Sequence, residues 1–205
     1  MDIPFLLRGL LIGFSIAAPV GPIGVLCIRR TLAEGRASGL VSGLGAATAD
    51  AFYGSIAGFG LTVISSFLID QQLWLRLIGG SFLLYLGVRT FLSKPSEHSA
   101  EVASSNLLTA YASTFFLTIT NPITIISFAA IFAGLGIGST NGDLGSAAVL
   151  VLGVFGGSAL WWFLLSAGVS LFRSRFDVRA LSWVNRISGI IITTFGVLAL
   201  ASLLA

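Results

Sequence analysis

The chain has 205 residues, of which 56% are hydrophobic and 9% are charged, with 11 Lys and Arg against 8 Asp and Glu. A mean hydropathy of +1.00 leaves too little polar surface for a water-soluble domain, so the composition indicates an integral membrane protein. In that class the excess of cations bears on orientation in the membrane and not on nucleic-acid binding. The single cysteine, Cys27, excludes an internal disulfide and a two-thiol redox relay.

Apolar runs of about 20 residues, long enough to cross the hydrocarbon core as helices, occupy nearly the whole chain. The first run is expected to be a mature span and not a signal peptide, because Asp2 stands where positive charge belongs and Pro19 follows the small residues of a would-be cleavage site. The sequence predicts an all-α, multi-pass membrane protein with six spans, at 5–28, 38–66, 72–92, 106–133, 144–172 and 182–204.

Two prolines and two glycines interrupt the first span, at Pro19, Gly21, Pro22 and Gly24. Each proline removes a backbone donor and clashes with the preceding turn, and lipid cannot satisfy the carbonyls that are freed. We therefore expect the first helix to be broken at its prolines, with the break buried in protein or facing water.

The fourth span carries a reduced form of the same pattern, in which Asn121, Pro122 and Thr124 interrupt an apolar segment. This helix too is predicted to break at its proline. Interrupted spans in corresponding positions of two halves are typical of the substrate site of a carrier. The alternative for either break is a kink without a ligand.

The two halves of the chain align with each other at an offset of 109 or 110 residues, which pairs Gly43, Gly58, Trp74, Gly80 and Gly87 with Gly153, Gly168, Trp183, Gly189 and Gly196. An odd number of spans per half inverts the second copy, so the pattern predicts two inverted three-helix repeats. We assign the first repeat to 1–92, a polar cytoplasmic linker to 93–105 and the second repeat to 106–205. Chance alignment of glycine-rich helices is the alternative.

The cations are unevenly distributed between the two sides of the predicted bundle. Eight of the eleven lie in loops on one side, at Arg29, Arg30, Arg36, Arg89, Lys94, Arg173, Arg175 and Arg179. The positive-inside rule places that side in the cytoplasm and both termini outside it.

Asp50 is the one acidic residue predicted near the centre of a span. An ionised carboxylate at this depth costs roughly 2.5 to 3.5 kcal/mol on insertion scales, so the group is protonated, hydrated in a cavity or waiting for a cation. A protonated carboxyl bonded to a neighbouring helix is the alternative. Tyr53, one turn later, is expected to donate a hydrogen bond to it.

The broken spans supply the complementary charge, since a helix that begins at Pro22 or Pro122 points free N–H groups and a positive dipole end into the cavity. An amino acid carries one group of each sign. We expect its ammonium to bind Asp50 and its carboxylate to bind the helix starts near Gly21, Gly24 and Asn121. The sequence offers no catalytic constellation, no metal site and no cofactor motif, and therefore no sign of an enzyme.

Three blocks carry a resemblance to a known family: 17–32 (AAPVGPIGVLCIRRTL), 43–54 (GLGAATADAFYG) and 117–130 (LTITNPITIISFAA). They closely resemble the LysE family of bacterial amino acid exporters in order and spacing, over essentially the whole chain. The resemblance implies a six-span carrier of the bacterial inner membrane, lying in lipid as a homodimer. It implies export of amino acids driven by the proton gradient or the membrane potential, with protons as a coupling ion for antiport, and roles for Asp50 and the proline-containing stretches.

The family's members export basic or neutral amino acids. Here the first motif reads Pro19-Val20-Gly21-Pro22, which departs from the Pro-Gly-Pro of the homoserine and threonine branch. The departure favours a basic substrate such as lysine or arginine. A neutral one such as threonine, homoserine or leucine is the alternative, and a metal ion is less favoured because only Asp50 would serve as a ligand.

Overall fold

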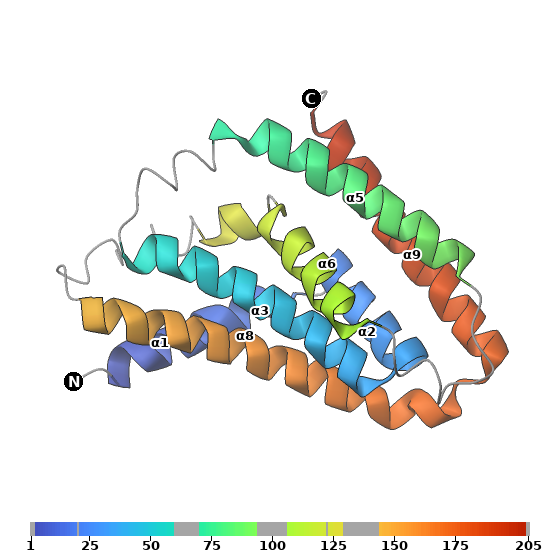
Figure 1. Ribbon diagram of the computed structural model, residues 1–205, viewed down its shortest axis with the longest axis horizontal. Helices are drawn as coiled ribbons and strands as arrows, with labels where there is room; N and C mark the ends of the chain where they lie inside the picture. The colour runs from blue at the N-terminus through green and yellow to red at the C-terminus, as the bar shows by residue number, and fades with distance from the viewer. Residues whose placement is uncertain are drawn as a thin grey trace.

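The computed structural model describes residues 3–19, 21–59, 70–93, 106–121, 123–128 and 144–203 (Figure 1). Every regular element in these ranges is helical, which confirms the all-α prediction: α1 (Ile3–Ala17), α2 (Pro22–Glu34), α3 (Arg36–Gly58), α5 (Gln72–Leu92), α6 (Leu107–Ile119), α8 (Leu144–Phe172), the short 3-10 helix η2 (Arg173–Arg175) and α9 (Val178–Ala201). Residues 123–128 are helical as well.

Among the described helices, three are long and apolar enough to cross a membrane unaided: Leu73–Leu92, Leu144–Arg175 and Val178–Ala201. The pair α1 and α2 passes the same test as one span bent by 81°. The helix α3 falls short because it is rich in Gly, Ala and Ser, and the fourth predicted span is divided after Ile119. The described part of the chain is thus a multi-pass membrane protein, and the prediction of six spans is not confirmed.

The first span breaks at the predicted place but continues further than predicted. Helix α1 ends at Ala17 and α2 begins at Pro22. Proline is tolerated in the first turn of a helix, because the N–H that it lacks would have no partner within the helix. Helix α2 runs beyond residue 28 until Gly35, whose φ of 108° lies in the left-handed region that favours glycine. Arg29 and Arg30 therefore lie in a helix and not in the predicted loop.

Helices from the two halves of the chain pack against each other. Helix α1 lies along α8, α5 lies along α9, and α3 packs against both α6 and α8 (Figure 1). Glycines bring α1 and α8 into backbone contact, since a Cβ on Gly13 would lie 2.0 Å from the carbonyl oxygen of Val154. Such approach is how helices associate in lipid, where van der Waals contact replaces the hydrophobic effect. The two predicted repeats consequently do not pack as separate units.

The buried apolar residues form two clusters on either side of Asp50 along α3. The first includes Leu26, Cys27, Ala46, Ala47, Leu117, Trp162 and Ile192. The second includes Ile12, Tyr53, Ile56, Ile125, Phe128, Leu150 and Val154. Many large apolar side chains on α5, α8 and α9 are exposed, as lipid contact requires.

Candidate functional site

A cavity of about 260 Å³ lies where the two breaks meet α3. Its wall contains seven of the nine predicted site residues: Pro19, Gly21, Pro22, Gly24, Asp50, Asn121 and Thr124. Pro122 lies outside the described residues, and Tyr53 is not part of the wall. Tertiary packing thus brings together groups that lie up to about a hundred residues apart in the sequence.

The carboxyl of Asp50 faces this cavity from a buried position on α3, with 3% of the residue exposed. The Ser158 hydroxyl donates to its Oδ2 at 2.7 Å, and the Trp162 indole Nε1 donates to Ser158 Oγ at 3.1 Å. The described lining of the cavity contains no Lys or Arg. The carboxyl therefore accepts a hydrogen bond from a hydroxyl of α8 but has no cationic partner in that lining.

The start of α2 forms another part of the wall. The first backbone hydrogen bond of this helix runs from Val25 N to Gly21 O at 3.0 Å, so the N–H groups of Ile23 and Gly24 precede the intrahelical ladder. Gly21 adopts φ −105°, which any residue can take, and a Cβ there would find no atom within 4 Å. Gly21 therefore borders open space, and its backbone conformation does not require glycine.

The second break is held by its own side chains. The hydroxyls of Thr118 and Thr120 donate to carbonyls one turn earlier, at 2.8 and 2.7 Å. Asn121 Oδ1 accepts from Ile123 N at 3.1 Å and so caps the helix at 123–128. The Asn121 contact satisfies an N–H group at the start of the next helix, while the threonine hydroxyls bond to carbonyls of the last turns of α6. The Asn121 amide nitrogen makes no hydrogen bond in the described structure, and Asn121 lines the cavity.

Tyr53 has a different partner from the one that the sequence predicted. Its hydroxyl donates to the carbonyl of Ile119, the last residue of α6, and not to Asp50. The expected Tyr53–Asp50 hydrogen bond was wrong because the side chain turns toward the second break, where a helix end leaves carbonyls unpaired. Tyr53 thus ties α3 to the end of α6 beside the cavity.

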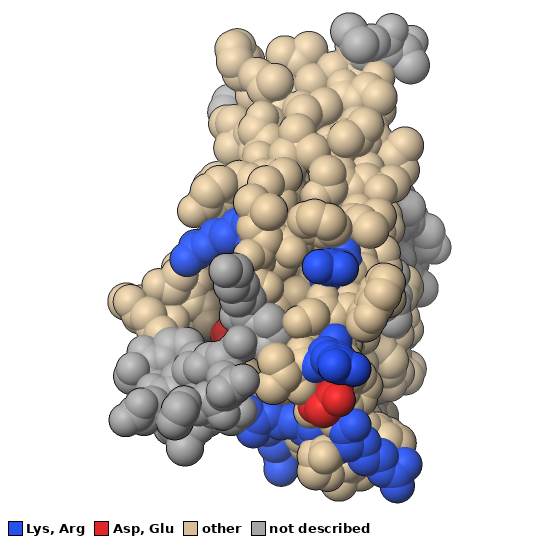
Figure 2. Space-filling view, turned by 90° about the vertical axis from the view of Figure 1, so that its right-hand side faces the viewer, with Lys and Arg blue, Asp and Glu red and all other residues tan. Residues whose placement is uncertain are grey.

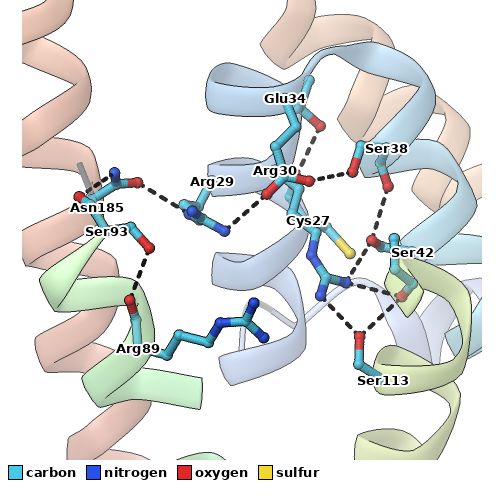
Figure 3. Close-up of polar contacts among 12 residues, drawn as sticks. Cys27, Arg29, Arg30, Glu34, Ser38, Ser42, Arg89, Ser93, Ser113 and Asn185 are labelled. Carbon is cyan, nitrogen blue, oxygen red and sulfur yellow. Dashed lines mark hydrogen bonds and ion pairs between the residues drawn. The ribbon is translucent and has the colours of Figure 1, made fainter. Parts of the chain in front are cut away.

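Sequence reasoning missed a buried arginine at the other end of α2. Arg30 is 7% exposed, and its Nη1 donates to Ser42 Oγ, Ala110 O and Thr114 Oγ1 at 2.8 to 2.9 Å. Its Nη2 donates to Ser113 Oγ at 2.8 Å (Figure 3). The missed signal is the set of hydroxyl residues on α3 and α6, which has meaning only once α2 is known to continue past residue 28.

Arg29 points to the opposite side of α2 (Figure 3). It pairs with Glu34 at 3.0 Å and donates from Nε to Asn185 Oδ1 on α9 at 3.0 Å, while Asn185 Nδ2 donates to Ser93 O at the end of α5 at 3.1 Å. We call Arg29, Arg30, Glu34 and Asn185 the arginine latch. It fastens α2 to four other helices and lies beside Arg173, whose Nε donates to Leu32 O at 3.1 Å. Figure 2 shows that Lys and Arg gather toward one end of the molecule.

The cavity adjoins a second hollow of about 320 Å³ on the side away from the latch. The two share five lining residues, Pro22, Ile23, Asn121, Ile123 and Phe195. The second hollow extends to Arg76 at the start of α5 and Ser202 after the end of α9, which hydrogen-bond to each other. The two hollows therefore form a continuous depression that runs from the cavity toward the end of the molecule opposite the latch.

Known bacterial proteins are similar in sequence to this chain over most of its length. The chain is 25% identical over 191 residues to YcgF of Bacillus subtilis (strain 168), named as a candidate amino acid efflux protein, covering 91% of this chain and 90% of that one. It is 25% identical over 188 residues to the uncharacterized membrane protein YrhP of the same organism, covering 84% and 87%. It is 27% identical over 149 residues to the uncharacterized membrane protein YahN of Escherichia coli (strain K12), covering 70% and 65%.

No solved structure gives a significant match. The family model described as "LysE type translocator" matches residues 14–203, a range that includes both breaks, Asp50 and the arginine latch. A match over nearly the whole chain, together with helices that can span a membrane, makes this protein a member of the LysE family of translocators.

Proposed function

We propose that this translocator is a secondary active exporter of amino acids. The observation that carries the proposal is the cavity in which the Asp50 carboxyl and the start of α2 lie in one wall. A carboxylate attracts the substrate ammonium, and the N–H groups of Ile23 and Gly24 suit its carboxylate at the positive end of the helix dipole. YcgF, named as a candidate amino acid efflux protein, supports the same class of cargo.

In the proposed cycle, substrate ammonium and proton compete for Asp50, and the cavity opens alternately to the two sides of the membrane. The arginine latch holds the basic end closed. Leu26 and Cys27, on α2 between the cavity and the latch, are 1% and 0% exposed, so no open path leads past them. The basic end faces the cytoplasm by the positive-inside rule, which places both termini outside it. Export would be driven by the proton gradient or the membrane potential across the bacterial inner membrane.

The inverted repeat and the homodimer are also parts of the proposal. Supporting the repeat, the glycines of the two aligned pairs contact each other crosswise between α5 and α9, as two copies related by a two-fold axis would. A Cβ on Gly80 would lie 3.3 Å from Gly196 O, and one on Gly87 would lie 3.0 Å from Gly189 O. The contacts α1–α8 and α3–α6, which the repeat makes equivalent, are both extensive. Of the predicted linker at 93–105, residues 94–105 lie outside the described residues.

Two substrate classes remain as candidates, and different observations favour each. The first motif favours basic amino acids. The described wall favours neutral ones, because it offers one acidic side chain, whereas lysine or arginine brings two cationic groups. Ile16 and Phe195 in the same wall suit an apolar side chain. Efflux from cells preloaded with labelled lysine, arginine, threonine and leucine separates the two classes.

The role of Asp50 is tested in inside-out vesicles with the labelled amino acid that this panel identifies. We expect Asp50→Asn to abolish transport while the protein still inserts, since the amide cannot bind an ammonium ion by charge. Asp70→Asn, the same change at an exposed residue, is the matched control and should transport like the wild type. Undiminished transport by Asp50→Asn would refute the proposed site.

A further inference from the structure

We propose that Ser158 and Trp162 are positioning residues that present a single oxygen of Asp50, Oδ1, to the substrate. Gly43 provides the space in which they do so. The inference rests on the proposed function, because it gives a role to residues that act on the substrate only through Asp50. None of the three was assigned to the site from sequence.

The direction of the two hydrogen bonds follows from which side-chain atoms can donate and which can accept. An indole N–H only donates, so Ser158 Oγ must accept at its 3.1 Å contact with Trp162. A serine hydroxyl has one proton of its own, and its acceptor in the described structure is Asp50 Oδ2 at 2.7 Å. Oδ2 is therefore held as an acceptor, and a proton or an ammonium ion is directed to Oδ1.

Burial makes this arrangement rigid. Ser158 is 0% exposed and Trp162 is 4% exposed, so water does not compete for their hydrogen bonds. In contrast, Asp50 Oδ1 makes no hydrogen bond to another described residue. Asp50 and Trp162 both line the cavity, so Oδ1 is the oxygen that remains for the substrate.

Gly43 allows the Trp162 ring to lie against the backbone of α3. A Cβ on Gly43 would come within 2.3 Å of Trp162 Cβ and 2.6 Å of its Cγ, distances at which something must move. Since α3 and α8 are antiparallel here, Gly54 lies opposite Val154, with the Asp50–Ser158 contact between these pairs. A methyl group at Gly43 would displace the indole and with it the donor that orients Ser158.

The test compares transport kinetics in inside-out vesicles, again with the amino acid identified by the panel. Loss of a hydrogen bond to a charged group predicts a KM for Ser158→Ala raised by about tenfold to a hundredfold, with a maximal rate near that of the wild type. Ser158→Thr keeps the hydroxyl and is expected to restore most of the affinity. Trp162→Phe should raise KM less, and it should add nothing in the Ser158→Ala background.

Trp162→Phe and Gly43→Ala each have a matched control variant. Trp161→Phe changes the neighbouring indole, which makes an edge contact with Phe14 and does not line the cavity. Gly58→Ala places a methyl group on the same helix at an ordinary distance of 3.6 Å from its nearest neighbour, whereas Gly43→Ala is expected to raise KM. Both controls should leave KM unchanged.

The inference is overturned if Ser158→Ala leaves KM unchanged while Asp50→Asn abolishes transport, or if the effects of Ser158→Ala and Trp162→Phe multiply. If Ser158→Ala does not insert, Trp162→Phe and Gly43→Ala decide, and an unchanged KM in both overturns it. Normal transport by Asp50→Asn is a different result: it removes the proposed role of Asp50 itself.

Discussion

Arg29 Nε donates to Asn185 Oδ1 at 3.0 Å and thereby joins the second half of the broken first span to the last helix. On the other side of α2, Arg30 is held by hydroxyls and a carbonyl of α3 and α6. Between this latch and the cavity lies Cys27, the single cysteine of the chain, with 0% exposure. The chain thus contains a natural reporter at the point where the proposed alternating access would open.

The first prediction uses that reporter. Asn185→Ala removes the contact to Arg29, and the loss of a hydrogen bond to a charged group, worth about 1.5 to 3 kcal/mol, shifts the latch toward its open form. We expect Cys27 to react with a water-soluble maleimide at least about fivefold faster from the basic side. The rate of labelling in inside-out vesicles is the measurement.

Ser182→Ala is the control for this prediction, because Ser182 is a half-buried residue of the same helix whose hydroxyl bonds only within α9. Its labelling rate should equal that of the wild type. Equal protection of Cys27 in Asn185→Ala would show that the latch does not close the basic end.

The second prediction concerns the contact between α1 and α8. Gly13→Ala places a methyl group 2.0 Å from Val154 O, a backbone atom that cannot turn aside, so the two helices must separate. We expect the free energy of unfolding to fall by about 1 to 3 kcal/mol, as in other overpacked cores, or the protein not to fold.

Gly168→Ala on α8 provides the comparison, because its Cβ would meet nothing within 4 Å. Alanine in a helix is favoured over glycine by about 0.5 to 1 kcal/mol, so this variant should be as stable as the wild type or slightly more so. Unfolding temperatures in detergent distinguish the two. Equal temperatures for both variants would contradict the packing of α1 on α8.

The third prediction separates two roles for Tyr53. Tyr53→Phe keeps the ring but removes the hydrogen bond to the Ile119 carbonyl, which costs about 1 kcal/mol of stability. Because this hydroxyl does not bond to Asp50, the KM for the exported amino acid should stay close to that of the wild type. Tyr85→Phe, at a residue that is 56% exposed, is the control for stability. A large rise in KM for Tyr53→Phe would restore the pairing with Asp50 that the sequence predicted.

Several parts of the site were predictable because each leaves a local signal. Pro19 and Pro22 cannot continue a helix in lipid, so the first break was expected where it lies. Asp50 is conspicuous because an acid is costly at that depth. By contrast, Ser158 leaves no such signal, since serine is common in membrane helices, and its meaning comes from the 2.7 Å contact with Asp50.

The sequence by itself determined that this is a helical membrane protein, where its first helix breaks, and which acid needs a partner. These properties follow from hydropathy, from proline and from the cost of burying charge, all of which act locally along the chain. Only the tertiary structure decided that Tyr53 faces Ile119, that Arg30 is buried among hydroxyls and that Ser158 supports Asp50. The physical reason is that hydrogen-bond partners are chosen by helix rotation and close packing at glycines such as Gly43 and Gly13, which local pattern does not fix.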